Sequence, residues 1–200
     1  MPRTTSTRER LIADAERLVH QRGFTATSVQ DVLAVTGVTK GALYHHFPGK
    51  GDLEMAVLEQ AGAAFINWLD EVLVGASPRE CLEHFFDSAL KHHRKQRFVG
   101  GCLFGNTAIE MSDVSRQHSD LVASVFDIWS NKIKQVILAA QTDGQIRDDM
   151  PARGLAEMVV ATIEGGIMLS RLRKDERPLR VCLDSLKALL WGQCAPIQEK

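Results

Sequence analysis

The stretch from Ser28 to Phe47 constrains the fold of this chain most, because it holds two very short helical patterns separated by a brief break. In the first pattern Ser28 can cap the helix, and Asp31 stands three residues later, as in a capping box. Gly37 can adopt the left-handed backbone conformation that commonly ends a helix. Two short helices joined by a tight turn are the layout of a helix-turn-helix motif.

The second helix of this motif has two different faces. Thr39 can cap it, and Leu43 and Phe47 recur one turn apart, so both should point inward. The opposite side is small, basic and aromatic, a surface that suits the major groove of DNA because short side chains admit base edges. The spacing alone is equally compatible with a small solvated helix. The residues of this outward side are Lys40, Gly41, Ala42, Tyr44 and His45.

Three short sequence motifs in this region resemble those of a known protein family. Gly-Phe24, Val38-Thr-Lys-Gly-Ala-Leu-Tyr44 and His46-Phe47 followed by Lys50 resemble the tetracycline-repressor (TetR) family of one-component regulators. The resemblance is specific from Arg8 to about Leu58 and architectural beyond. It implies that Lys40 and His45 read bases and that Tyr44 and Lys50 contact phosphates. Close approach or supporting contacts are expected from Thr27, Ser28, Gln30, Thr39, Gly41 and Ala42.

The rest of the chain reads as helices only, which predicts an all-α protein of about nine helices. Besides the helix-turn-helix, helical spacing of apolar residues indicates helices over 7–22, 50–73, 78–93, 102–111, 115–142, 151–171 and 179–191. We expect an N-terminal three-helix DNA-binding domain over residues 1–50. A larger helical domain for ligand binding and dimerisation should cover residues 51–200.

Charge and composition narrow the class of protein further. The chain is 44% hydrophobic and 24% charged, as ordinary globular proteins are. Residues 1–50 carry a net charge of +3, although the whole chain carries −1, so the predicted head is basic and the body acidic. We expect no signal peptide and no membrane span. We also expect no disulfide framework, since the four cysteines are widely spaced and form no CxxC motif. A cytoplasmic location follows as an expectation.

The helices over 151–171 and 179–191 are apolar on more than one side, which indicates burial inside the fold or against another chain. The resemblance implies a homodimer whose interface is a four-helix bundle of these helices. A two-fold dimer would present paired recognition helices to a pseudo-palindromic operator with half-sites about 34–36 Å apart. The predicted interface residues are Val160, Ala161, Gly165, Ile167, Leu186 and Leu190.

Family architecture also implies a ligand pocket among the helices between residues 50 and 171. The apolar candidates are Phe86, Phe104, Phe126, Trp129 and Met168, and plain core packing is the alternative for each aromatic ring. Possible polar anchors are Asn106, Glu110 and Glu164. Glu164 is an acid inside an apolar run of the helix, so its carboxylate needs a partner. It could pair within the dimer interface, with Arg171 or Arg173, or with a cationic ligand.

Cys102 follows Gly100-Gly101 at the predicted start of a helix, where the helix dipole favours a thiolate. The segment resembles a subgroup of the family that regulates efflux or detoxification. The resemblance is carried by the motif Gly-Cys-Leu, the helix of small residues that follows it, and Glu110. Some members of this subgroup sense electrophiles through a cysteine placed like this one. The alternative is an inert, buried cysteine.

These features together predict a ligand-responsive repressor that a small apolar or reactive molecule releases from its operator, with efflux or detoxification genes as targets. We expect no catalytic residues, no metal site and no cofactor. Two rival classes remain open. One is a small enzyme with Cys102 as nucleophile and His92, His93 or His118 as base. The other is a helical interaction protein that retains the motif but reads no operator.

Overall fold

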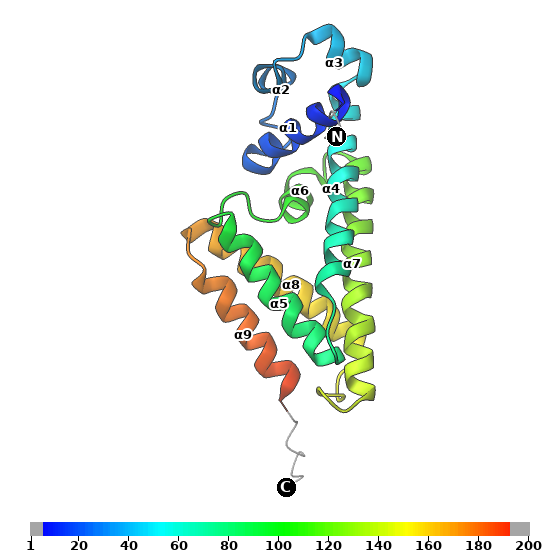
Figure 1. The fold of residues 1–200 in the computed structure, drawn as a ribbon, viewed down its shortest axis with the longest axis vertical. Helices are drawn as coiled ribbons and strands as arrows, with labels where there is room; N and C mark the ends of the chain where they lie inside the picture. Colours follow the sequence, from blue (N-terminus) through cyan, green and yellow to red (C-terminus); the bar gives the residue numbers. More distant parts are fainter. Residues whose placement is uncertain (1–5, 193–200) are drawn as a thin grey trace, which may run out of the picture. The chain divides into compact units, whose positions relative to one another are not determined.

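The computed structural model describes residues 6–192, and this part of the chain forms helices and no strands (Figure 1). The helices within it are α1 (Thr7–Arg22), α2 (Val29–Thr36), α3 (Lys40–His46), α4 (Lys50–Val72), α5 (Pro78–Lys95), α6 (Leu103–Met111), α7 (Arg116–Thr142), α8 (Ala152–Arg173) and α9 (Arg177–Trp191). The predicted all-α class is therefore confirmed. Cys194 lies outside the described residues.

The described chain divides into two compact units. One contains residues 6–65 and 102–125, and the other contains residues 66–101 and 126–192. Consequently α6 and the first part of α7 belong to the same unit as α1, α2 and α3. By packing, the unit that holds the helix-turn-helix extends well beyond residue 50. A functional boundary at that residue stays a prediction.

The first unit has a small core beneath α1, α2 and α3. Leu11 and Ile12 of α1 are buried together with Leu43 of α3 and Val57 of α4. Phe24, in the turn between α1 and α2, is also buried, and its burial contributes about 3 kcal/mol of hydrophobic stabilisation. This aromatic ring fills the core between the helix-turn-helix and the helices behind it.

The caps that the sequence predicts are present. The backbone N–H of Asp31 donates to Ser28 Oγ over 3.2 Å, and the N–H of Ser28 donates to Asp31 Oδ2 over 2.8 Å. Gly37 ends α2 with φ = 68°, and Thr39 Oγ1 accepts from the N–H of Ala42 over 3.3 Å. These local bonds fix where α2 and α3 begin and end.

The second unit is organised around the pair α8 and α9, which lie side by side (Figure 1). The two helices approach closely at Gly166, where an added Cβ would lie 3.0 Å from Leu179 Cδ1 and 3.2 Å from Cys182. Ser170 is completely buried, and its Oγ accepts a hydrogen bond from the N–H of Leu179 over 2.9 Å. No described helix is long and apolar enough to cross a membrane.

The faces of α8 and α9 that point outward differ from the prediction. The side chains of Val160, Ile167, Leu186 and Leu190 are buried within the single chain, so these four predicted interface residues are core residues. The sequence could not separate the two faces because α8 is apolar nearly all round. Ala161 is exposed and Gly165 half-buried. The large exposed apolar residues of the two helices are Met168, Leu172, Val181 and Leu189.

Candidate DNA interface and the contacts behind it

The outward face of α3 carries the side chains that the sequence singled out. Lys40, Gly41, Tyr44 and His45 are exposed, and Ala42 is half-buried. The Nζ atom of Lys40 lies 5.9 Å from the centroid of the Tyr44 ring. A short helix with this face exposed offers two cationic or polar donors and an aromatic hydroxyl to a partner.

The inward side of α3 is held by packing and by α1. Leu43 and Phe47 are buried, as predicted. The guanidinium of Arg8 lies 5.2 Å from the centroid of the Phe47 ring, and Arg10 Nη2 donates to the carbonyl oxygen of Thr36 over 3.1 Å. Both arginines therefore tie α1 to the ends of the two helices of the motif, which fixes the orientation of α3.

The N-terminal end of α2 offers a second set of polar groups. Ser28 and Gln30 are exposed there, and Thr39 is exposed at the start of α3. Hydrogen bonds from the side chain and the backbone of Ser28, with the nearby charge of Arg22, hold the pKa of Asp31 below its usual value. Asp31 is thus an anion that serves the cap of its own helix.

Thr27 differs from its predicted role. Its side chain is only 3% exposed, and its Oγ1 donates to the carbonyl oxygen of Gly23 over 2.7 Å. The hydroxyl is used to close the turn after α1, so Thr27 supports the motif from inside and does not present a donor on its surface.

Lys50, at the start of α4, is directed at the turn between α1 and α2. Its Nζ atom donates to the carbonyl oxygen of Phe24 over 2.8 Å and lies 3.1 Å from Glu54 Oε1. The side chain is 40% exposed, and an ammonium has three donors, so these contacts do not use all of its hydrogen-bonding capacity. The predicted phosphate contact of Lys50 stays a prediction.

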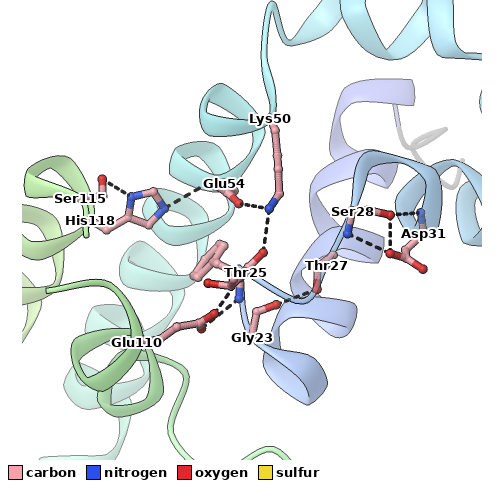
Figure 2. A network of polar contacts seen from close by, with 11 residues as sticks. Gly23, Thr25, Thr27, Ser28, Asp31, Lys50, Glu54, Glu110, Ser115 and His118 are labelled. Carbon is pink, nitrogen blue, oxygen red and sulfur yellow. Dashed lines mark hydrogen bonds and ion pairs between the residues drawn. The ribbon is translucent and has the colours of Figure 1, made fainter. Parts of the chain in front are cut away.

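Glu110 of α6 binds the same turn from the other side, as Figure 2 shows. Its Oε2 accepts from the N–H of Phe24 over 3.0 Å and its Oε1 accepts from the N–H of Thr25 over 2.7 Å. Burial alone would raise the pKa of Glu110, but the bonds from Thr25 and Phe24 and the charge of Lys50 outweigh it, so this pKa lies below its usual value.

His118 of α7 extends this network. Its Nδ1 lies 2.8 Å from Ser115 Oγ, and its Nε2 lies 3.6 Å from Glu54 Oε2 (Figure 2). The ring is buried and packs edge-on against Phe24, with 5.2 Å between the ring centroids. From the sequence, His118 was expected only as a possible catalytic base and Glu54 had no predicted role, because partners so far apart in sequence leave no local signal.

The predicted ligand-binding residues fall into both units. In the first unit Cys102 caps α6, Phe104 is buried with its ring centroid 5.5 Å from that of Phe65, and Asn106 is half-buried. In the second unit Phe86 is fully buried in the core, whereas Met168 is 55% exposed and does not line an interior. The remaining three candidates of this unit are Phe126 and Trp129, whose rings stack with centroids 5.9 Å apart, and the half-buried Glu164.

No cluster of three or more His, Cys, Asp or Glu side chains suited to a metal ion occurs within residues 6–192. The first unit contains a capped helix-turn-helix whose second helix exposes a basic and aromatic face. Contacts from α1, α4 and α6 fix this motif from behind. This combination defines a helix-turn-helix DNA-binding protein.

The family models agree with this class. Residues 11–57 match the model of bacterial regulatory proteins of the tetR family, and residues 78–186 match the tetracyclin repressor-like C-terminal domain. The chain belongs to the TetR family of transcriptional regulators.

Individual relatives extend over nearly the whole chain. The HTH-type transcriptional regulator MT0206 of Mycobacterium tuberculosis is 32% identical over 192 residues, which cover 93% of this chain and 95% of the relative. The HTH-type transcriptional repressor DhaR of Mycobacterium sp. strain GP1 is 27% identical, covering 88% of this chain and 87% of its own length. The crystal structure of the regulatory protein TetR from Rhodobacter sphaeroides matches with a TM-score of 0.85 and 25% identity, covering 91% of this chain and 97% of that one.

Proposed function

We propose that this regulator is a ligand-responsive repressor that binds a pseudo-palindromic operator as a homodimer. The observation that carries the proposal is the exposed face of α3, where Lys40, Tyr44 and His45 stand beside Gly41. Lys40 and His45 would donate to base edges in the major groove. Tyr44, Ser28, Gln30 and Thr39 would contact phosphates or support those contacts, which position a protein without reading sequence.

The homodimer is supported by the exposed apolar side chains of α8 and α9. Met168 and Leu172 are 55% and 76% exposed and lie one turn apart on α8, and the exposed Ala161 lies two turns before Met168. On α9, Val181 and Leu189 are also exposed, at 53% and 47%. Exposed large apolar side chains that gather on a surface mark an interaction site, and a second copy of the chain fits here because an isologous interface needs only one kind of surface.

Release from the operator would occur through a population shift. A small apolar or reactive molecule that binds one conformation of the dimer more tightly would favour an arrangement in which the two recognition helices no longer match the half-sites. The coupling available for such a shift is typically about 1–3 kcal/mol. Genes for efflux or detoxification are the proposed targets.

The test is selection of bound fragments from the genome that encodes the protein, followed by fluorescence anisotropy on the selected duplex. Wild-type protein should retain a discrete fragment with two related half-sites. Lys40→Ala, which removes a base-reading donor from the exposed face of α3, should weaken this binding. A wild-type protein that retains no fragment above background would disprove operator binding.

A second candidate is a repressor that senses electrophiles through Cys102. The observation that favours it is the position of the sulfur at the N-cap of α6, where Sγ lies 3.5 Å from the N–H of Gly105 and the residue is half-buried. Burial raises the pKa of the thiols of Cys81 and Cys182, which makes them suitable comparisons. NemR of Escherichia coli, an HTH-type transcriptional repressor 25% identical over 190 residues, has been crystallised in a reduced form.

A quinone is a suitable probe for this candidate. The sulfur of Cys102 would add to a ring carbon, and the thiol proton would end on a quinone oxygen, so no further reactant is needed. Mass spectrometry should find the adduct on Cys102 before Cys81 or Cys182. Operator release by the quinone should be lost in Cys102→Ser and kept in Cys182→Ser. Equal release in both variants would exclude this candidate.

A further inference from the structure

We infer that Glu110 is a positioning residue for operator binding, because its carboxylate fixes the turn that leads into the helix-turn-helix. The inference rests on the proposed operator binding. Glu110 itself lies behind the motif, and its carboxylate is directed at the backbone of the turn between α1 and α2 (Figure 2).

The turn is clamped on both sides by charged groups. On one side the two oxygens of Glu110 accept from consecutive backbone amides, those of Phe24 and Thr25, over 3.0 and 2.7 Å. On the other side Lys50 Nζ donates to the carbonyl oxygen of Phe24 over 2.8 Å. Hydrogen bonds to charged groups are stronger than neutral ones, and a carboxylate that spans two successive amides also fixes their direction.

The backbone at Gly23 is shaped for this carboxylate. Gly23 has φ = 89°, and a Cβ built on it would lie 2.6 Å from Glu110 Oε2 and 2.9 Å from Oε1. Only a residue without a side chain leaves room for the carboxylate at this distance. The end of α1 and the start of the turn are therefore complementary to Glu110.

The clamped turn leads directly into the motif. Thr27 and Ser28 follow it within three residues, and Ser28 is the N-cap of α2. A shift of the Phe24–Thr25 backbone would therefore move the start of α2 and, through the short turn at Gly37, α3 as well. At its other end α6 is capped by Cys102, about 12 Å of helical rise from Glu110, so one short helix carries both the cap and the clamp.

Two measurements on the full-length protein test this role. Glu110→Ala should speed amide hydrogen exchange at residues 23–25 at least about tenfold and weaken binding to the selected operator duplex about 3- to 30-fold. The dependence of binding on salt concentration should stay as in wild type, because Glu110 neutralises no phosphate. Glu110→Gln should recover part of both effects, since its amide oxygen can still accept one backbone bond. Glu59→Ala, which removes an exposed acid from α4, is the matched control.

Gly23→Ala provides a second route to the same clamp, because its methyl group would displace the carboxylate; it also strains the backbone at φ = 89°, a cost that is the same with and without Glu110 and cancels in the double variant. The effects of Gly23→Ala and Glu110→Ala on operator affinity should be non-additive in the double variant. Circular dichroism must show every variant folded at the assay temperature.

The outcomes separate the possibilities. Unchanged exchange, unchanged affinity, or an affinity loss with a changed salt dependence in Glu110→Ala would each overturn the positioning role. Additive effects of the two substitutions would also overturn it. A wild-type protein that binds no operator would instead refute the proposed function, and the positioning role with it.

Discussion

Lys50 Nζ donates a hydrogen bond to the carbonyl oxygen of Phe24 over 2.8 Å, so the lysine at the start of α4 holds the turn that precedes the helix-turn-helix. The same ammonium lies 3.1 Å from Glu54 Oε1. A lysine in this position can serve two purposes, since it can fix the motif from behind and still direct its remaining donor at a phosphate.

The first prediction separates these two purposes. Lys50→Gln should weaken operator binding, and the slope of log K against log salt concentration should become shallower by about 1.8, the amount expected when the dimer loses one phosphate contact from each subunit. Lys91→Gln, which removes an exposed lysine from α5, is the control for charge alone. Weaker binding with the wild-type slope would mean that Lys50 acts only through the Phe24 carbonyl.

The second prediction concerns the bases read by α3. Lys40→Ala and His45→Ala should each lower affinity for the operator by about 1–3 kcal/mol per half-site and relax the preference at one base position in each half-site. Competition with duplexes altered at single positions measures this preference. Equal losses on operator and random duplexes would show that the two side chains contact only the DNA backbone.

The third prediction is a pH dependence of stability. The pKa of Glu110 is lowered from 4.5 in the folded protein, so the stabilisation by its carboxylate is fully present above that value and is lost as the pH falls through the folded pKa. Glu110→Gln should lower the free energy of unfolding by about 1 kcal/mol near neutral pH. Urea unfolding between neutral pH and about pH 3 should show this difference shrinking below pH 4.5.

Glu59→Gln is the exposed control for that series. A difference between wild type and Glu110→Gln that stays constant across the acid range would mean that the carboxylate charge does not stabilise the turn.

The fourth prediction concerns the surface of α8 and α9. Leu172→Glu should convert the protein to a monomer at micromolar concentration, because a charge would be buried without a partner at a self-complementary interface. Leu138→Glu, at an exposed apolar position of α7, should leave the oligomeric state unchanged. Sedimentation velocity measures both. A dimeric Leu172→Glu protein would place the interface elsewhere.

The local structure of the first unit could be predicted from the sequence because its signals lie close together. Ser28 with Asp31, Gly37 and Thr39 each act within a few residues, and the structure confirms all of these caps. The inward direction of Leu43 and Phe47 follows from the helical period and is confirmed as well.

The contacts behind the motif could not be predicted in the same way. Glu110 is bonded to Phe24, 86 residues earlier, and nothing around Glu110 in the sequence distinguishes it from a polar anchor of a pocket. The outward face of α8 also escaped prediction, because apolar residues on every side remove the periodicity that would separate core from interface. Thr27 was expected to support phosphate or base contacts, but its hydroxyl closes the preceding turn.

The most direct measurement is the ratio of dissociation constants for the selected operator and for random duplex, determined at physiological salt with the dimer. If α3 reads bases in two half-sites, the operator should bind at least about a thousandfold more tightly, and Lys40→Ala should reduce this ratio. Equal binding of both duplexes would contradict operator reading by α3.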